Sequence, residues 1–339
     1  MNSAQVPTIP RPEHLPPAPA GKGGWPWDVQ LPVGERHPPD GSDWPRICVV
    51  TPSYNQGAFI EETIRSILLQ AYPNLEYFVM DGGSTDNTIA VIQKYEPWLS
   101  GWVSEKDRGQ AHAVNKGWSR SSGPILGWLN SDDLYTPGAL YAVAEAWRRC
   151  GQPGMVYGDA LSVDVHLRPR GRKEMQGYSL RTMLLGRCMP QPAVFISTDL
   201  FASIGPLDES LWYALDFEYF LRAWLHPMAD SFCHIPQVLA YSRVHPDTKC
   251  STGGARHVHE NVTVLHDVWH KRMDTYHRSQ EWRGTFAHAL VRQAGKAARL
   301  KALRLAWAQF AEAWHWSPRT TFCSAPRFVA NAMQKTQGR

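Results

Sequence analysis

The pattern that decides the fold lies in residues 47–81, ICVVTPSYNQGAFIEETIRSILLQAYPNLEYFVMD. It begins with a β-branched run, Ile47 to Thr51, which is typical of a strand buried on both faces. Apolar residues then recur at helical spacing from Ile60 to Ala71, and a second apolar run covers Leu75 to Met80. A strand, a helix and a second strand at this spacing predict a right-handed βαβ unit and a parallel sheet.

The alternation of strands and helices continues toward the middle of the chain. A helix capped by Ser84 or Thr85 is expected to end at Pro97, and Thr136 with Pro137 reads as the start of another. Strands are expected at GWVS (101–104) and PILGWL (124–129). Ligands bind at the carboxyl ends of strands in such sheets, and every predicted end here is polar and loop-forming. These ends are 51–53, 81–83 and 130–133.

Composition limits the class of protein. The net charge of +4 over 339 residues is too small to argue for a nucleic-acid partner. Without an apolar run near 18 residues, no transmembrane helix is expected. The six cysteines are scattered without a CxxC pair, so no disulfide framework or zinc ribbon is expected, and a reducing compartment fits best. They are Cys48, Cys150, Cys188, Cys233, Cys250 and Cys323.

Two adjacent carboxylates stand where the PILGWL strand ends, in GWLNSDDLY (127–135). Asp132 and Asp133 repel each other, so solvent, a helix N-terminus or a cation must compensate them. Mg²⁺ and Mn²⁺ prefer carboxylate oxygens and share their shell with substrate phosphates. The motif therefore indicates a divalent metal cofactor, with a plain turn before Pro137 as the alternative.

Several segments together resemble family 2 glycosyltransferases in the order of that family's motifs. The match covers roughly Ile47 to Ser251. Four segments resemble the nucleotide-sugar half of the family: VVTPSYNQG, DGGSTDNT, SEKDRGQAHAVNKG and GWLNSDDLY. The acceptor half is resembled by QPAVFISTDLF, IGPLDESLWYALDFEYFLRAW and SRVHPDTKCS. We expect an α/β fold of the glycosyltransferase A type: a Rossmann-like, mostly parallel sheet with helices on both faces, plus a helical C-terminal tail.

The resemblance also implies an activity and a division of the chain. The activity is inverting, metal-dependent transfer from a UDP- or dTDP-sugar to a hydroxyl of a glycan or lipid-linked acceptor, in bacterial surface polysaccharide synthesis. A Pro/Gly-rich arm over 1–46 precedes a catalytic domain over 47–255, and Trp25 and Trp27 are expected to dock the arm on the body. Within that domain, 47–135 is the nucleotide-sugar half and 136–255 the acceptor half. Residues 256–339 form a basic helical extension.

Site residues follow from the resemblance position by position. Asn130-Ser131-Asp132 occupies the family's Asp-x-Asp motif, with Asn in place of the first carboxylate. Asp132 and Asp133 are the implied metal ligands, and His245 completes the shell. Asp81 is expected to accept a hydrogen bond from a pyrimidine ring. The residues implied in nucleotide binding are Pro52, Ser53, Tyr54, Asp81, Asp107, Arg108, Asn115, Ser131 and Lys249.

For several of these residues a structural interpretation stays open. DGGSTD can be a simple strand-to-helix turn, and the segment with Asp107, Arg108, Asn115 and Lys116 can be a solvated loop. His245 can equally be a structural histidine.

Asp216 is the candidate general base. It lies at the start of a predicted helix, where the macrodipole favours the ionised carboxylate. The alternative is that Asp216 serves only as the helix N-cap. Gln191 is a weaker candidate for a sugar contact. His259-Glu260 is not a zinc-protease motif, because Thr263 stands where HExxH needs histidine.

Two other functions remain as alternatives. A nucleotidyltransferase that makes nucleotide sugars would want a Gly-rich, basic phosphate loop, which TPSYNQG does not provide. A non-catalytic binding module would have lost the metal or base carboxylates, yet Asp132, Asp133 and Asp216 are all present.

The basic helical segment 283–309 has six basic and no acidic residues. It either packs on the catalytic domain or makes peripheral membrane contact. The expected location is the cytoplasm, either free or on the cytoplasmic face of a membrane.

Overall fold

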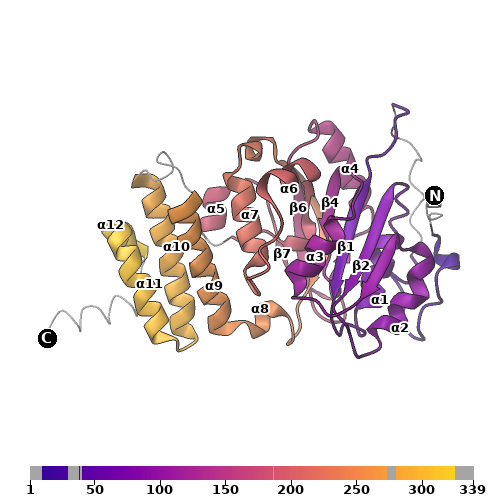
Figure 1. Cartoon of the computed structure of the whole chain (residues 1–339), viewed down its shortest axis with the longest axis horizontal. Coiled ribbons are helices and arrows are strands. Elements are labelled where there is room, and N and C mark those ends of the chain that lie inside the picture. Colours follow the sequence, from indigo (N-terminus) through magenta and orange to yellow (C-terminus); the bar gives the residue numbers. More distant parts are fainter. Residues whose placement is uncertain (1–9, 30–37, 39, 186, 273–279, 325–339) are drawn as a thin grey trace. The chain divides into compact units, whose positions relative to one another are not determined.

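The computed structural model describes residues 10–29, 38, 40–185, 187–272 and 280–324. The chain divides into two compact units, each described by itself. The first unit holds the strands, and the second is helical (Figure 1). The first unit comprises Met1–Gln176, Pro190–Glu209 and Met228–His245; the second comprises Gly177–Met189, Ser210–Pro227 and Pro246–Arg339.

One sheet forms the centre of the first unit. Four of its strands are parallel in the order β3-β2-β1-β4, as the βαβ pattern predicts. Beyond β4 the sheet is mixed: β8 is antiparallel to both β4 and β6, while β6 and β9 are parallel. The antiparallel pairs β5–β9 and β6–β7 complete it. The strands are β1 (Ile47–Ser53), β2 (Leu75–Asp81), β3 (Gly101–Ser104), β4 (Ile125–Trp128), β5 (Leu134–Tyr135), β6 (Met155–Val163), β7 (Pro169–Lys173), β8 (Val194–Ser197) and β9 (Cys233–Arg243).

Helices cover both faces of the parallel part. Ile47 and Val49 of β1 share a core with Ile60, Ile64 and Ile67 of α1. Val50 points to the opposite face, because side chains alternate along a strand, and there α3 packs so closely that a Cβ on Gly117 would lie 2.5 Å from Val50. The helices are α1 (Ile60–Leu68), α2 (Thr88–Tyr95), α3 (Gln110–Trp118), α4 (Ala139–Arg149) and α6 (Thr198–Ile204), with 3-10 turns η1 (Pro12–His14), η2 (Glu96–Trp98), η3 (Gln191–Ala193) and η4 (Pro227–Ser231).

Two expected helix starts are wrong. The helix α2 begins at Thr88, because Ser84 instead donates its hydroxyl to Asp81. The helix α4 begins at Ala139, because Gly138 takes a left-handed conformation (φ 80°) and the Thr136 hydroxyl donates to the Val238 carbonyl. The Ser84 hydroxyl also accepts the backbone N–H of Asn55, so in both loops the side chain expected to cap a helix stabilises a contact between distant segments instead.

The described part of the N-terminal arm docks on the first unit, as its tryptophans predict. Trp27 is buried, and Trp25 donates its indole N–H to the Tyr135 carbonyl at 2.9 Å. The anchor is Arg65 of α1, a residue that is only 1% exposed. It donates to the carbonyls of Pro16, Pro26 and Trp27 at 2.8, 3.0 and 2.7 Å and lies over the Trp27 ring. A buried cation is tolerated here because arm carbonyls replace its water.

The cysteines do not all remain free thiols, contrary to the expectation from their spacing. Cys150, which follows α4, and Cys233, which opens β9, form a disulfide across 83 residues of sequence. Spacing motifs do not reveal such a pair, because the fold brings the two residues together from distant segments. A reducing compartment is therefore no longer favoured by cysteine usage. The thiol of Cys48 is buried, and burial raises its pKa to about 12.

The second unit is built of helices. Its longest helix, α10 (Gln280–Arg299), packs against α9, α11 and α12. The other elements are α5 (Leu180–Leu184), α7 (Leu215–Leu225), α8 (Lys249–Thr252), α9 (Gly254–Asp267), the π-helix η5 (Val268–Arg272), α11 (Leu303–Trp316) and α12 (Pro318–Ser324). An aromatic core joins Trp269 to Phe286 and Trp316, with ring centroids 4.8 and 5.1 Å apart.

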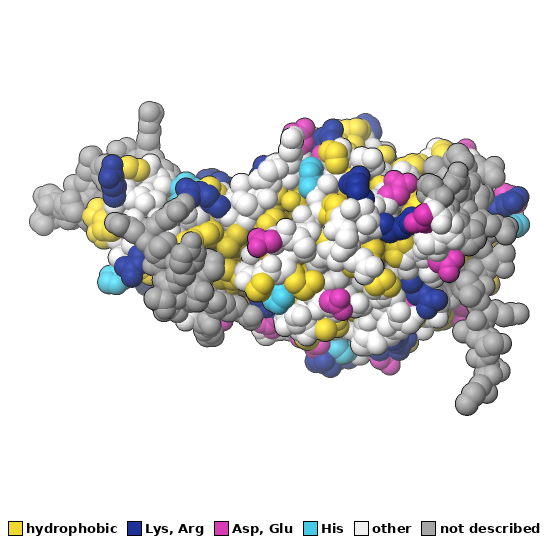
Figure 2. Space-filling model, turned by 90° about the horizontal axis from the view of Figure 1, so that it is seen from above, with side chains coloured by type: hydrophobic (Ala, Val, Ile, Leu, Met, Phe, Trp, Pro, Cys, Tyr) yellow, Lys and Arg dark blue, Asp and Glu magenta, His cyan; other side chains and the backbone are white. Residues whose placement is uncertain are grey.

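The surface of the helical unit is basic and partly apolar. Lys and Arg side chains lie beside hydrophobic ones on the face shown in Figure 2. Leu300, Trp307 and Trp314 are exposed. Within the described residues, none of the helices combines the length and hydropathy needed to cross a bilayer.

Replacing Arg65 tests the docking of the arm. We expect Arg65→Met to lower the free energy of unfolding by about 3 kcal/mol, because three buried carbonyls lose a charged donor. Urea unfolding measures this loss, and trypsin cleavage after Lys22 should accelerate. The exposed Lys94→Met is the matched control. An unchanged unfolding midpoint in Arg65→Met would contradict the anchoring role.

Candidate active site

The strand register brings three polar side chains into line at the carboxyl edge of the sheet. Ser53 pairs with Asp81, and Asp81 pairs with Ser104. The buried Asp81 carboxylate accepts hydrogen bonds from the Ser104 hydroxyl at 2.6 Å and from the backbone N–H groups of Gly83 and Ser84 at 3.1 and 2.9 Å. Asp81 is thus fixed in position by its own loop.

The loops that follow β1 and β2 are held together side by side. Asn55 donates its N–H to the Ser84 hydroxyl at 2.7 Å and accepts from the Thr85 N–H at 2.8 Å. The Gly57 N–H donates to Asp86. A Cβ on Gly57 would lie 1.7 Å from an oxygen of Asn87, so a larger residue would separate the loops. The motifs PSYNQG and DGGSTDNT therefore form one rigid wall.

The expected nucleotide-binding residues at this wall differ in exposure. Pro52 and Ser53 are buried at the end of β1, whereas Tyr54 is 61% exposed. Asp107 reaches the same wall, since a Cβ on Gly82 would lie 2.9 Å from its carboxylate. Its Oδ1 accepts the Gly109 N–H at 2.8 Å. These four side chains come from two separate segments of the sequence.

Arg108, Asn115 and Lys116 are engaged elsewhere. The Arg108 guanidinium pairs with Glu209, and Lys116 pairs with Glu105. The Asn115 amide exchanges hydrogen bonds with the backbone of Leu207 at 3.0 and 2.9 Å. In this structure these contacts stabilise the α3 segment, so the structure does not turn the three side chains toward the Asp81 loop.

Asp132 and His245 meet across 113 residues of sequence. His245 Nε2 lies 3.1 Å from Asp132 Oδ2, and the imidazole is buried against the Phe59 ring. Ser131 is buried in the same turn. The side-chain Oδ1 of Asn130 already accepts hydrogen bonds from Gln110 Nε2 at 2.5 Å and Trp128 Nε1 at 2.7 Å. Asn130 therefore positions the turn that carries Asp132.

Asp133 is buried behind this pair. Its Oδ1 accepts the backbone N–H of Arg243 at 2.8 Å. Burial raises the pKa of Asp133 well above its ordinary value, and the adjacent Asp132 raises it further. The Arg243 backbone bond and charge act in the opposite direction. The groups around Asp133 thus compensate its ionised form only in part.

Arg243 is a site residue that the sequence did not single out. Its buried guanidinium donates to Glu62 and lies 4.8 Å from the centre of the Phe59 ring. Its Nε and Nη1 atoms have no hydrogen-bond partner among the described residues. The Ser53 hydroxyl and Gln191 Oε1 share this condition, and Gln191 Nε2 donates to the Trp128 carbonyl at 2.6 Å. The only sequence signal for Arg243 is its position in the SRVH segment, two residues before His245.

Asp216 lies in the second unit, one residue into α7. The N-cap is Ala214, so the interpretation of Asp216 as the cap is wrong. Glu260 of α9 accepts the backbone N–H groups of Trp212, Tyr213 and Ala214 at 3.1, 2.6 and 2.9 Å. Glu260, which belongs to no zinc-protease motif, thus fixes the segment that leads into the helix carrying Asp216.

Two more side chains of the second unit, His257 and Lys249, have defined surroundings. Burial lowers the pKa of His257, against the opposite effect of the Asp216 charge. Lys249 donates to the Trp212 carbonyl at 2.9 Å and lies 4.5 Å from the centre of the Trp212 ring. Lys249 therefore contacts the segment that leads into α7.

Comparison with known proteins identifies the scaffold. The model of the family described as Glycosyl transferase family 2 matches residues 48–202. S. aureus TarS 1–349, solved in complex with UDP-GlcNAc, superposes with a TM-score of 0.59 at 16% identity, over 79% of this chain and 89% of that one. At this identity the likeness shows the fold alone, and it agrees with the expected glycosyltransferase A-type architecture.

Sequence relatives extend the comparison. An uncharacterized glycosyltransferase of Mycobacterium tuberculosis is 34% identical over 185 residues, covering 53% of this chain and 70% of the relative. A PGL/p-HBAD biosynthesis glycosyltransferase of Mycobacterium bovis is 26% identical over 196 residues, 56% of this chain and 75% of the relative. Together with the strand order and the motifs of the sheet edge, these matches show that the chain is a glycosyltransferase and belongs to glycosyl transferase family 2.

Proposed function

We propose that this enzyme is an inverting, divalent-cation-dependent glycosyltransferase that uses a UDP- or dTDP-sugar and a hydroxyl of a glycan or lipid-linked acceptor. The observation that carries the proposal is the 3.1 Å separation of Asp132 Oδ2 and His245 Nε2. Ligand atoms about 2.0–2.2 Å from one cation lie about 3 Å from each other. This spacing, and the two adjacent carboxylates of which Asp133 is buried, both suit a bound Mg²⁺ or Mn²⁺.

The residues around the cation would divide the work. When bound, a divalent cation supplies a Lewis acid for the oxygens of the departing diphosphate. Asp132 and His245 would hold it, and Asp133 would serve as a further ligand or sugar contact beside Ser131. Arg243 contributes a fixed positive charge behind Asp133. Such preorganised charge is the largest single contribution in many transferase sites.

The rigid wall would bind the nucleoside. A carboxylate oxygen accepts two hydrogen bonds, and Asp81 Oδ1 receives one from the Ser84 hydroxyl. It therefore keeps capacity for a pyrimidine N–H, while Pro52, Ser53 and Tyr54 line the ring and Asp107 meets ribose or sugar hydroxyls. Arg108 and Asn115 would have to leave Glu209 and Leu207 to contact phosphate. Lys249 would neutralise diphosphate charge.

Asp216 would act as the general base. The first turn of α7 favours its ionised form, and an ionised carboxylate can take the acceptor's proton as its oxygen attacks the anomeric carbon. One base without a nucleophile is the arrangement of an inverting transfer. Residues 47–135 would form the donor half, 136–255 the acceptor half and 256–339 the helical extension.

The cellular setting is inferred from the surface of the helical unit and from one sequence relative. We infer a cytoplasmic enzyme of bacterial surface polysaccharide synthesis. The exposed Trp307 and Trp314 of α11, with the basic residues of segment 283–309, support peripheral contact with an anionic membrane. The name of the Mycobacterium bovis relative, a PGL/p-HBAD biosynthesis glycosyltransferase, supports a lipid-linked acceptor.

Calorimetry with nucleotides tests the metal site. UDP, dTDP and GDP should be titrated with and without Mn²⁺ into the wild type and Asp132→Ala. We expect a pyrimidine diphosphate to bind at least about tenfold more tightly with Mn²⁺, and Asp132→Ala to remove this gain. The exposed Asp230→Ala is the control. Binding that does not depend on metal would mean that basic residues such as Arg108 and Lys249 contact the phosphates. It would contradict the proposed cation site.

Asp81 is tested by separating stability from recognition. Asp81→Asn should lower stability by about 1–3 kcal/mol, since its loop N–H groups lose a charged acceptor, and should also weaken UDP binding. Ser104→Ala removes one of the same hydrogen bonds while leaving the pyrimidine acceptor in place. If both variants lose UDP affinity in proportion to stability, Asp81 has only a structural role.

Asp216→Asn tests catalysis against mere binding. We expect kcat to fall by about 10²- to 10⁴-fold, the usual contribution of a general base, with UDP affinity unchanged. Transfer from radiolabelled UDP- and dTDP-sugars to lipid and glycan extracts gives the rate, and Asp230→Asn is the control. A wild type that binds nucleotide but transfers no sugar would favour the binding module.

A further inference from the structure

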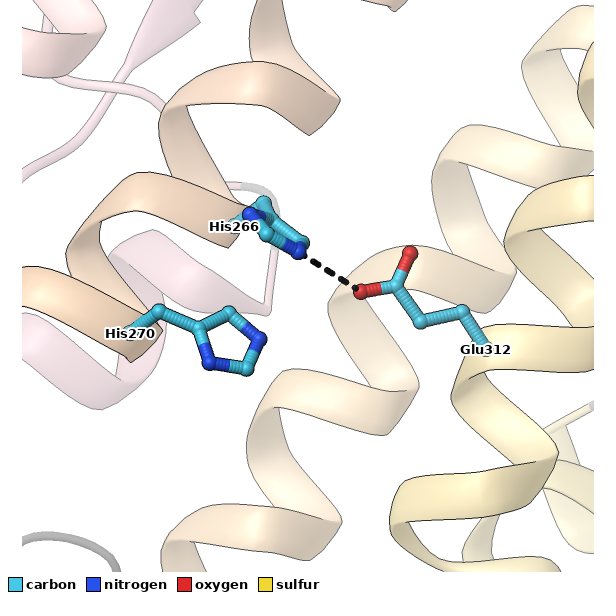
Figure 3. Close-up of side chains that lie close together, drawn as sticks. All are labelled: His266, His270 and Glu312. Atoms are coloured by element: carbon cyan, nitrogen blue, oxygen red, sulfur yellow. Dashed lines mark ion pairs between the residues drawn. The ribbon is translucent and has the colours of Figure 1, made fainter.

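Three side chains of the types that commonly bind metals lie close together in the helical unit. His266 lies in the last turn of α9, His270 follows four residues later in the π-helix η5, and Glu312 belongs to α11. Figure 3 shows the two imidazoles projecting from one helical segment toward the side on which Glu312 approaches from the other. None of the three has a part in the proposed sugar transfer.

The distances suit a single small cation after modest side-chain rotation. The ligand atoms of the three residues all lie within 4.8 Å of one another. His266 Nε2 is 3.8 Å from Glu312 Oε1, and the two imidazole centroids are 4.2 Å apart. Ligand atoms about 2.0–2.2 Å from Zn²⁺ stand slightly more than 3 Å apart. Movements of the ligand atoms on the order of 1 Å would bring these distances to the spacing around Zn²⁺, and both His266 and Glu312 are partly exposed.

The backbones that carry the ligands are already fixed. Trp269, adjacent to His270, stacks on Trp316 of α11 with centroids 5.1 Å apart, and it also contacts Phe286 of α10. Trp316 lies one helical turn beyond Glu312, since residues four apart share a helix face. The aromatic core therefore holds the His266–His270 segment and the Glu312 helix beside each other before any cation binds.

The charge pattern favours a cation over a simple ion pair. An isolated, half-exposed His–Glu pair such as His266–Glu312 contributes about 0–1 kcal/mol. The second imidazole at 4.2 Å would repel the first if both were protonated. Two neutral imidazoles and one carboxylate form a mixed N,N,O set, which suits zinc better than the hard cations expected at Asp132.

We propose that His266, His270 and Glu312 form a Zn²⁺ site that joins the α9–η5 segment to α11. Three protein ligands leave one position for water or an external ligand, as in zinc sites with an open coordination position. Its main effect is to stabilise the helical unit, because a cation bound by the folded state alone raises the free energy of unfolding. The site stands independently of the sugar-transfer proposal.

The test uses the full chain carrying Asp132→Ala, so that the first site does not contribute. Zn²⁺ is titrated calorimetrically, Tm is measured with and without Zn²⁺, and Co²⁺ is added as a visible probe of tetrahedral coordination. We expect one equivalent of Zn²⁺, a higher Tm and Co²⁺ absorption bands. His270→Ala and Glu312→Gln should each weaken Zn²⁺ binding by at least about tenfold.

Matched histidines control for unspecific binding. His259 on α9 and His315 on α11 are exposed and lie outside the cluster. His259→Ala and His315→Ala should keep the affinity and the rise in Tm. Glu312→Gln, which keeps the side-chain shape, should retain the metal-free Tm and lose only the Zn²⁺-dependent rise. Absence of Zn²⁺ binding, or equal losses in cluster and control variants, would overturn the site.

Discussion

The hydrogen bond from the Arg243 backbone N–H to Asp133 Oδ1 is the contact on which the proposed metal site depends. It is 2.8 Å long and joins the end of β9 to the turn after β4, across 110 residues. Two residues further on, His245 arrives 3.1 Å from Asp132. Without this junction the turn would carry two repelling carboxylates and the histidine would have no fixed position beside them.

A chain of charges, buried except at the exposed Lys22, connects this junction to the N-terminal arm. The Arg243 guanidinium donates to Glu62 on α1, and Glu62 also accepts from Lys22 of the arm at 2.8 Å. One turn after Glu62, Arg65 donates hydrogen bonds to the arm's carbonyls. Buried charges are costly unless paired, so the arm belongs to the electrostatic structure of the sheet edge and is more than a linker.

The two proposed cation sites differ in chemistry for a physical reason. The Asp132 site lies at a sheet edge, where two carboxylates and one buried imidazole would share a hard cation with phosphate oxygens. The His266 cluster lies on the surface of the helical unit, has two imidazoles for one carboxylate, and rests on an aromatic core. The Asp132 site therefore suits turnover of a charged substrate, and the His266 cluster suits a cation that links two helical segments and stabilises the unit.

Local sequence determined the parallel part of the sheet and the polar loops at its carboxyl edge. Hydrophobic periodicity specifies β1, α1 and β2 because it reflects which face of each element is buried, and the positions of Asp81 and Asp132 at strand ends followed from it. The capping residues were misjudged, since the Ser84 hydroxyl accepts the backbone N–H of the distant Asn55 and the Thr136 hydroxyl donates to the distant Val238 carbonyl. Tertiary structure alone decided the mixed pairing beyond β4, the Cys150–Cys233 disulfide, the burial of Arg243 and the role of Glu260. Each of these joins segments far apart in the chain, and neither periodicity nor motif spacing carries information on which distant partner a side chain meets.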